Sequence, residues 1–553
     1  MLSTLVVQLD GTIVADSLDP FYEQVREQLL RFSDLVYRVE RLHMYRMSRL
    51  TLWQAAARGM TARSVLEVLR RHSEHGIPYE VQQQVVTDMG WWGRIRLVFH
   101  DEHNFALTAS SEDLKAIADA CKLPKHLKGS LPSRWVFPMS VRASVKQTLA
   151  QKGFPCVDEL GYQRAAPIEL SWRANAGLRD YQAAAVESFL SADTGQSGVV
   201  VLPCGAGKTL VGIGAMVELD VETLIFAPTD TACNQWRQEI LEKTTIHPSQ
   251  VGMYRETGKI SPVTIATYHR VAAANQKGTR RHFATLSNHR WGLVIYDEVH
   301  MLPAPLFRLA ADMQSVRRLG LTATLIREDG AETDVFSLIG PKCYEAAWKD
   351  LEQQGYLAKV RCVEVRVPLP GTERETYEST DRRHRHKLAA LNSAKLEILM
   401  DLARLHVNDS VLVIGHYLDH LYEAAELLSS PVVTGKTPLA EREHWFEAFR
   451  NGSLKRLVLS RVANMSVDIP CASVIIQLSG LYGSRQEEAQ RLGRLLRPDS
   501  GPGVFYTVVT NHSVEADMSR HRSLFLIEQG YHYEVIDGQL IDPINHSERM
   551  IQP

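Results

Sequence analysis

Short apolar runs of strand length recur in two long stretches of the chain, and segments of helix length separate them. The first series consists of residues 198–202, 223–227, 263–267, 293–296 and 319–322. The second consists of residues 410–414, 457–459, 473–478 and 504–509. Apolar runs that alternate with helices are typical of strands buried in a parallel sheet. The pattern therefore predicts two similar α/β domains in tandem, with residues 342–395 between the two series.

The chain before residue 173 has a different pattern. Residues 1–97 begin with a short strand or hairpin and continue with helical spacing of apolar residues, and Thr61 is placed to start a helix. Residues 98–172 alternate short strands with one helix over residues 111–121. We therefore expect an α-rich N-terminal domain followed by a small α+β domain.

The composition limits the class of protein but identifies no functional residue. At 553 residues the chain is too long to fold around one hydrophobic core, so several domains are expected. Its apolar content of 45% and charged content of 23% are those of an ordinary globular protein. The net charge of -2 gives no overall attraction to nucleic acid, so such binding needs local basic surface. The cysteines form no Cys-x-x-Cys pair, which argues against a disulfide framework or a zinc ribbon. Since the chain has neither a basic leader nor a membrane-length apolar run, we expect a cytoplasmic protein without membrane contact.

A glycine-rich turn follows the first strand of the first series. The turn consists of Gly205, Ala206, Gly207, Lys208 and Thr209. Free backbone N–H groups at the start of the next helix can bind phosphate, Lys208 can reach the outer phosphates of a nucleotide, and Thr209 can ligate Mg²⁺. The strict phosphate-loop pattern has glycine where this chain has Leu202, so the motif is a variant.

A second candidate motif ends the strand at 293–296. Asp297 and Glu298 follow four apolar residues, and the carboxyl end of this strand can share a sheet edge with the phosphate loop. Asp297 can hold Mg²⁺, and Glu298 can orient and deprotonate an attacking water. By itself an Asp-Glu pair at a strand end is common, so its meaning depends on the phosphate loop.

Two further motifs complete the candidate site. Thr322 and Thr324 place hydroxyls at the end of another strand. Gln490, Arg494 and Arg497 recur at spacings of four and three, so they share one face of a helix in the second α/β domain. Such a face can supply arginines to a γ-phosphate, where charge develops during phosphoryl transfer. The sequence thus predicts an ATP site divided between two domains.

In this order the motifs resemble those of superfamily 2 helicases. The Asp-Glu-Val-His sequence ending at His300, the triplet Arg327-Glu328-Asp329, and residues 483–494 and 526–531 resemble XPB helicases of bacterial or archaeal form. The resemblance is specific over about 173–537. It implies RecA-like domains over 173–345 and 346–553 that bind ATP and Mg²⁺ and move along DNA with 3′ to 5′ polarity in DNA repair. It also implies a monomer and a nuclease as a plausible partner.

The family resemblance further implies roles for individual residues. Arg179 and Gln182 would contact the adenine. The residues that would contact the DNA strand or couple it to the nucleotide are Pro228, Thr229, Thr267, His300, Thr322, Thr324, Ser460 and Ser466. Asp468 would bridge to the nucleotide, and Arg327, Glu328 and Asp329 would act in strand separation. Ala463-Asn464 stands where the family has Gly-Asp, which puts the coupling at that loop in question.

Other features are weaker. Residues 373–387 take the place of the family's thumb insertion, and residues 98–172 take that of its damage-recognition-like domain. The adjacent pair Trp91-Trp92 can stack on bases, although buried aromatics are commoner. The pair His416 and His420 lacks the glutamate of a zinc protease, and we expect these histidines between a strand end and the next helix. We expect His384 and His386 on a charged exposed face.

Three alternatives to a DNA helicase remain open from the sequence. The chain could be a translocase on duplex DNA that unwinds little, a damage- or partner-binding scaffold whose ATPase only switches its shape, or a motor on RNA.

Overall fold

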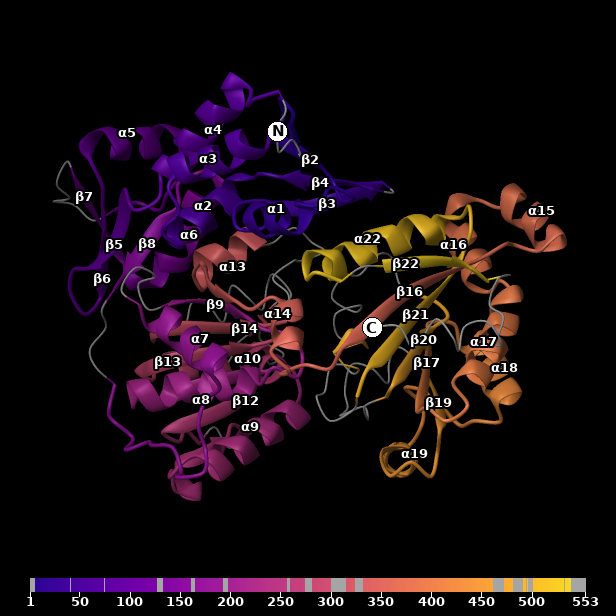
Figure 1. The fold of residues 1–553 in the computed structure, drawn as a ribbon. Helices are drawn as coiled ribbons and strands as arrows, with labels where there is room; N and C mark the ends of the chain where they lie inside the picture. Colours follow the sequence, from indigo (N-terminus) through magenta and orange to yellow (C-terminus); the bar gives the residue numbers. More distant parts are fainter. Residues whose placement is uncertain are drawn as a thin grey trace. The chain divides into compact units, whose positions relative to one another are not determined.

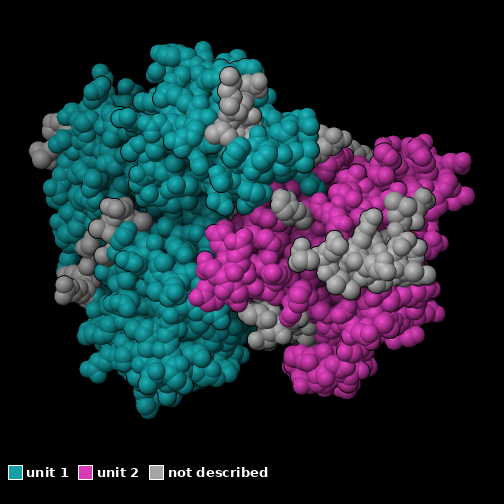
Figure 2. Space-filling model, in the orientation of Figure 1, with its two compact units in different colours: residues 1–202, 207–346 teal, residues 203–206, 347–553 magenta. Residues whose placement is uncertain are grey.

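The computed structural model divides the chain into two compact units (Figure 2). Unit 1 comprises Met1–Leu202 and Gly207–Ala346, and unit 2 comprises Pro203–Ala206 and Ala347–Pro553. The predicted division into four domains stays a prediction. The structure describes residues 5–39, 41–73, 75–126, 133–160, 165–191, 197–255, 259–273, 281–299, 315–323, 332–460, 472–480, 491–493, 495, 501–531 and 533–538.

The N-terminal part of unit 1 is rich in helix, as expected, and it also contains a four-stranded antiparallel sheet where the sequence predicts only a short strand or hairpin. Its antiparallel sheet has the order β1-β2-β4-β3, with β1 at Leu5–Val7, β2 at Thr12–Asp16, β4 at Leu42–Arg46 and β3 at Asp34–Val39. The helices are α1 Tyr22–Leu29, α2 Arg49–Ala57, α3 Ala62–His72 and α4 Tyr79–Gly90. The hydrophobic pattern does not predict strand β4, because the polar residue His43 takes one of its buried positions. The His43 ring is hydrogen-bonded to the Tyr22 hydroxyl. The predicted helix start at Thr61 is confirmed, since its side chain accepts from the Ser64 N–H at 3.1 Å.

A four-stranded mixed sheet follows, as the α+β pattern predicts. Its order is β7-β6-β5-β8, with β7 at Arg134–Pro138, β6 at Asn104–Thr108, β5 at Ile95–Phe99 and β8 at Cys156–Glu159. Helices α5 Ser111–Ala120 and α6 Arg142–Gln151 accompany it. The adjacent tryptophans pack against protein: the Trp91 ring lies 4.8 Å from Phe154, and the Trp92 ring 5.7 Å from Phe336.

The first predicted parallel sheet is confirmed (Figure 1). It has seven strands in the order β11-β12-β10-β13-β14-β9-β15. They are β11 Val251–Met253, β12 Val263–Thr267, β10 Thr223–Ala227, β13 Trp291–Asp297, β14 Ser315–Thr322, β9 Ser197–Val201 and β15 Lys342–Glu345. The accompanying helices are α7 Asp180–Leu190, α8 Lys208–Leu219, α9 Asp230–Lys243, α10 Tyr268–Ala272, α11 Arg281–Ser287 and α13 Glu332–Leu338. Five of these strands were predicted, and the two short edge strands were not.

A buried ion cluster joins this sheet to the mixed sheet within unit 1. Asp158 of β8 accepts from Arg142 at 2.6 Å, Lys146 at 2.7 Å and Arg318 at 3.3 Å. Arg318 belongs to β14, and its side chain is only 2% exposed. Burial alone would raise the pKa of Asp158, but the three positive charges outweigh it and hold that pKa well below its usual range. The mixed sheet is therefore fixed to a central strand of the parallel sheet.

Unit 2 contains the second predicted parallel sheet, in the order β18-β19-β17-β20-β21-β16-β22. The strands are β18 Val432–Val433, β19 Arg456–Ser460, β17 Val411–Gly415, β20 Val474–Gln477, β21 Gly503–Thr510, β16 Val360–Val367 and β22 Tyr533–Asp537. The helices are α14 Trp348–Gln353, α15 Gly371–Ser379, α16 Arg382–Ala390, α17 Ala394–Leu405, α18 Leu418–Leu428, α19 Leu439–Arg450 and α22 Val514–Glu528.

Strand β16 lies within residues 342–395, where the sequence pattern predicts no strand. This strand pairs along its whole length with β21, inside the second sheet. Its charged residues concealed it, yet Glu364 is 1% exposed and accepts from the Ser519 hydroxyl at 2.8 Å. Glu364 is also paired with Arg366 at 3.1 Å, and a buried carboxylate is tolerated in a sheet when it has both a charged partner and a hydrogen-bond donor.

Among the described residues, no helix is long and apolar enough to cross a membrane. The six cysteines in the same part of the chain are free thiols.

Candidate nucleotide-binding site

The phosphate loop leaves the carboxyl end of β9 and opens helix α8 at Lys208. Gly205 and Gly207 have φ angles of +83° and +76°, which glycine adopts without strain. Leu202, which stands where the strict pattern has glycine, is fully buried, and its N–H donates to the Thr322 carbonyl at 3.0 Å. The strand hydrogen bonding thus continues through this position, which explains why a leucine is suitable there.

Gln182 is buried beside the phosphate loop. Its side chain is 1% exposed, and its Oε1 accepts from the Arg179 N–H at 2.9 Å. A Cβ at Gly207 would lie 2.5 Å from Gln182 Nε2, so the glycine lets the amide approach the loop. The structure thus brings Arg179, Gln182 and Gly207 together, while the contact with adenine stays a prediction.

Lys208 and Glu298 meet although they lie far apart in the sequence. Lys208 Nζ lies 3.1 Å from Glu298 Oε1, and both side chains are largely buried, with exposed fractions of 12% and 20%. Glu298 follows β13 with φ at +50°, a left-handed conformation that is unusual for any residue except glycine. Backbone strain of this kind is concentrated at functional sites. The left-handed conformation of Glu298 turns the backbone directly after Asp297, so both acidic residues stay at the end of β13.

The carboxylate of Asp297 is held by a side chain from another element. Trp236 of α9 donates from Nε1 to Asp297 Oδ2 at 2.9 Å, and the Tyr268 hydroxyl donates to the Asp297 carbonyl at 2.7 Å. Burial and the nearby charge of Glu298 raise the pKa of Asp297. A divalent cation would offset this excess of negative charge, and carboxylate and hydroxyl oxygens are ligands that Mg²⁺ accepts. The Asp297 carboxylate therefore has the chemistry that the predicted magnesium site requires, and Thr209 as the second ligand stays a prediction.

The predicted strand-contacting residues of unit 1 lie along the same sheet edge. Pro228 and Thr229 follow β10, and Thr267 ends the neighbouring strand β12, where it pairs with Ala227. Thr322 ends β14 and is fully buried. The other predicted residues of this group lie outside the described residues; they are His300, Thr324, Arg327, Glu328 and Asp329.

In the part of unit 2 that follows residue 346, one predicted site residue lies among the described residues. Ser460 ends β19 and is buried. The residues Ser466, Asp468, Gln490, Arg494 and Arg497 lie outside the described part of the chain, so their roles stay predictions. Next to them in sequence, Leu492 and Leu495 are fully buried, and Arg491 is hydrogen-bonded to Gln477 of β20.

The thumb-like segment 373–387 falls on helices α15 and α16. His384 is exposed, as expected, but His386 is 2% exposed and hydrogen-bonded to the Tyr417 hydroxyl at 3.2 Å, so its expected exposure is wrong. His416 lies between strand β17 and helix α18, as predicted, whereas His420 lies in the first turn of α18. Burial lowers the pKa of His420 to about 4. The described residues contain no cluster of three or more potential metal ligands.

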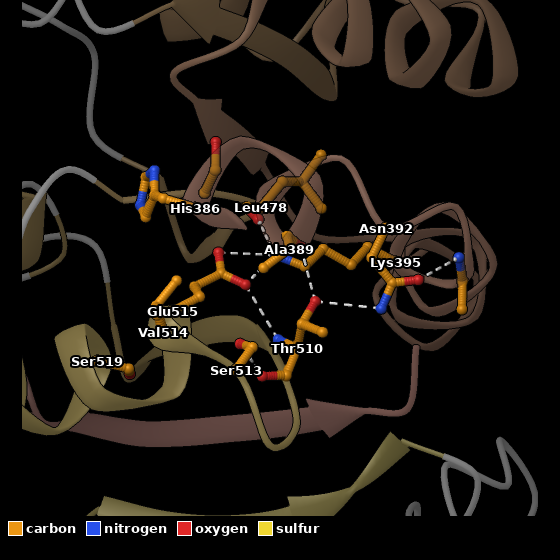
Figure 3. A network of polar contacts seen from close by, with 12 residues as sticks. His386, Ala389, Asn392, Lys395, Leu478, Thr510, Ser513, Val514, Glu515 and Ser519 are labelled. Atoms are coloured by element: carbon orange, nitrogen blue, oxygen red, sulfur yellow. Dashed lines mark hydrogen bonds and ion pairs between the residues drawn. The ribbon is translucent and has the colours of Figure 1, made fainter. Parts of the chain in front are cut away.

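A buried polar network connects α16 and α17 with the ends of β20 and β21 (Figure 3). Lys395 Nζ donates to both carboxylate oxygens of Glu515, at 2.8 and 2.7 Å, and to the Leu478 carbonyl at 2.8 Å. The Thr510 N–H also donates to Glu515, and the Thr510 hydroxyl donates to the Ala389 carbonyl. The sequence does not predict the pair of Lys395 and Glu515, nor the contacts of Trp236 and Tyr268, because no local pattern marks partners that are distant in the chain.

Two seven-stranded parallel sheets, with a phosphate loop and an Asp-Glu strand end on the first, define the chain as an α/β protein of the helicase class. Family models support this class. Residues 351–550 match the ERCC3/RAD25/XPB C-terminal helicase, residues 175–327 the type III restriction enzyme res subunit, and residues 5–128 the helicase conserved C-terminal domain.

Proteins from several organisms are similar over nearly the whole chain. The protein named DNA 3'-5' helicase XPB of Kineococcus radiotolerans is 44% identical over 547 residues, which are 97% of this chain and 97% of that protein. Its namesake of Mycobacterium tuberculosis is 43% identical, over 97% of this chain and 98% of that protein. The general transcription and DNA repair factor IIH helicase/translocase subunit XPB of Antonospora locustae is 31% identical, over 96% and 81%. The chain belongs to the XPB helicase family.

Proposed function

We propose that this protein is an ATP-dependent DNA helicase with 3′ to 5′ polarity that acts in DNA repair. The observation that carries the proposal is the contact between Lys208 and Glu298 at 3.1 Å, on the sheet edge that also carries Thr229 and Thr267. In this proposal the nucleotide chemistry and the contact with the DNA strand share one edge of the sheet. The names of the bacterial relatives, DNA 3'-5' helicase XPB, agree with this activity.

The site residues have distinct tasks in this proposal. The backbone N–H groups at the start of α8 hold the phosphates, and Lys208 turns from Glu298 to the outer phosphate oxygens. The Glu298 carboxylate is then free to orient and deprotonate the attacking water. Bound Mg²⁺ would neutralise developing charge, with Asp297 and Thr209 as the residues that hold it. Arg494 and Arg497 supply positive charge from the second sheet's domain.

The sharpest test is ATP turnover with and without DNA, in the wild type and in Lys208→Ala. The proposal predicts turnover that DNA stimulates in the wild type and that falls to background in Lys208→Ala, because the variant has lost its phosphate-binding charge. Lys243→Ala at the far end of α9 is a matched control and should keep wild-type turnover. Equal residual activity in wild type and Lys208→Ala would contradict the proposal, including its ATPase step.

The substrate is tested separately from the chemistry. A forked DNA with one labelled strand should be unwound with 3′ to 5′ polarity, and RNA should compete poorly. Strand movement on duplex DNA without release of the labelled strand would instead favour the translocase alternative. Stimulation by RNA equal to that by DNA would contradict the choice of DNA.

The finer predictions belong to the same proposal. They are a monomeric state, a nuclease partner, a requirement for Mg²⁺ and a cytoplasmic location. The free thiols of the described residues agree with a reducing compartment such as the cytoplasm. Sedimentation of the purified chain tests the first, and capture of partners from the source cell, followed by a nuclease assay, tests the second.

A further inference from the structure

Two hydrogen bonds at the end of β13 have no part in the chemistry assigned above. Trp236 donates to the carboxylate of Asp297, and Tyr268 donates to the carbonyl of the same residue. Together they fix both the side chain and the backbone of the proposed magnesium ligand. The two donors come from different elements, so Asp297 is held from two directions.

Both donors lie on the elements that follow the proposed strand-contacting residues. Thr229 caps helix α9 by accepting from the Ala232 N–H at 3.1 Å, and Trp236 lies on that helix two turns further on, about 10 Å along its axis. Tyr268 directly follows Thr267 and is the first residue of α10. Each proposed DNA contact is therefore joined to Asp297 through one short element.

Close packing prevents either ring from turning independently of its element. Trp236 is 1% exposed, and a Cβ at Gly212 of α8 would lie 2.4 Å from its Cη2 atom. The Tyr268 ring is stacked on Phe226, with centroids 5.6 Å apart and an angle of 22° between the planes. Because closely packed side chains move with their backbones, a shift of α9 or α10 moves the donated hydrogen bond as well.

We propose that Trp236 and Tyr268 are positioning residues that couple contact with a DNA strand to the placement of the Asp297 carboxylate. The inference depends on the proposed function, since it needs a DNA strand at Thr229 and Thr267. A strand that displaces either threonine shifts the attached donor and thereby reorients Asp297. Coupling between two binding sites is reciprocal, so nucleotide bound with Mg²⁺ must change the affinity for DNA through the same two bonds.

The variants Trp236→Phe and Tyr268→Phe remove one donor each and keep an aromatic ring. Trp291→Phe is the matched control: Trp291 begins the same strand, is 2% exposed, and donates from Nε1 to the Leu286 carbonyl at 2.8 Å. It loses a buried indole hydrogen bond that does not reach Asp297. Any effect common to all three variants therefore comes from general destabilisation of the sheet.

The first measurement is binding alone. The affinity for a labelled single-stranded oligonucleotide is measured with and without Mg²⁺ and a non-hydrolysable ATP analogue. We expect the ratio of the two affinities to move towards one in Trp236→Phe and in Tyr268→Phe, since each variant keeps one of the two bonds, and to keep its wild-type value in Trp291→Phe. The second measurement is the stimulation of ATP turnover by DNA. It should fall about tenfold or more in Trp236→Phe, which loses a hydrogen bond to a charged carboxylate, and by roughly two- to tenfold in Tyr268→Phe, which loses one to a neutral carbonyl.

The inference is overturned if both variants keep the wild-type ratio and stimulation, or if Trp291→Phe loses them equally. Should Trp236→Phe fail to fold, Tyr268→Phe decides by the same readings. A wild-type protein whose turnover DNA does not stimulate would contradict the proposed function itself. Normal stimulation in the wild type together with unchanged variants would overturn only the coupling role of Trp236 and Tyr268.

Discussion

The buried pair of Lys395 and Glu515 allows a quantitative prediction about unit 2. The side chains are 0% and 1% exposed, and Lys395 uses its three N–H donors on Glu515 and the Leu478 carbonyl (Figure 3). Glu515→Gln leaves the ammonium buried without a counter-charge, and removing one partner of a buried pair lowers the free energy of unfolding by about 3–5 kcal/mol. Lys395→Met leaves a buried carboxylate and should lower it by a similar amount.

The double variant Lys395→Met/Glu515→Gln separates this explanation from simple loss of contacts. It removes both charges and leaves mainly the Leu478 carbonyl without its donor, a loss of about 1–3 kcal/mol. The double variant should therefore be more stable than either single variant. For a unit of this size, 1 kcal/mol shifts the thermal midpoint by about 2–4 °C, so Glu515→Gln should lower it by roughly 6–20 °C.

The assay is thermal unfolding of the full chain, with hydrogen exchange in α17 and β21 as the reading that is specific for unit 2. Glu378→Gln is the control, because it breaks the pair between Arg374 and Glu378, whose side chains are 66% and 65% exposed. An exposed pair contributes at most about 1 kcal/mol. The reasoning is refuted if Glu515→Gln is as stable as Glu378→Gln, or if the double variant loses as much as the two single variants together.

Three further predictions concern the remaining parts of the molecule. Glu298→Gln should bind ATP and DNA but hydrolyse ATP at least about 100-fold more slowly, which single-turnover kinetics would detect, and near-normal turnover would exclude Glu298 as the base. Asp158→Asn should destabilise unit 1 by about 3–5 kcal/mol at pH 7. The depressed pKa of Asp158 means that this stabilisation is present above about pH 4 and is lost as the pH falls below it, so unfolding midpoints of wild type and variant should converge in acid; a constant gap would contradict the ion-cluster explanation. Arg327→Ala should spare ATP turnover and impair unwinding of a fork, whereas loss of both would indicate a structural role.

The strands at the centres of the two sheets could be predicted from the sequence. Strands β10 and β12 have the predicted bounds, because they are short apolar runs with no competing pattern. The strands that were missed are short, at an edge, or charged, such as β16 with its buried Glu364. Such a residue can be buried because Ser519 donates to it, and that partner is 155 positions away.

The candidate site also has features that the sequence predicts and features that it leaves open. The sequence by itself determined the phosphate loop, the Asp-Glu strand end and their order, because these motifs are local and each residue type has few chemical alternatives. It also carried the resemblance to XPB helicases, which the comparisons bear out. The motifs alone do not show which side chains position Asp297, or why leucine can replace glycine at position 202.

Only the tertiary structure decided those points, because they depend on atoms brought together from distant parts of the chain. The indole of Trp236 reaches Asp297 only when α9 packs on the sheet beside Gly212. Lys395 of α17 meets Glu515 of α22 only when α17 packs beside the end of β21. A hydrogen bond or a buried ion pair requires a specific distance and direction, and no spacing along the chain encodes these.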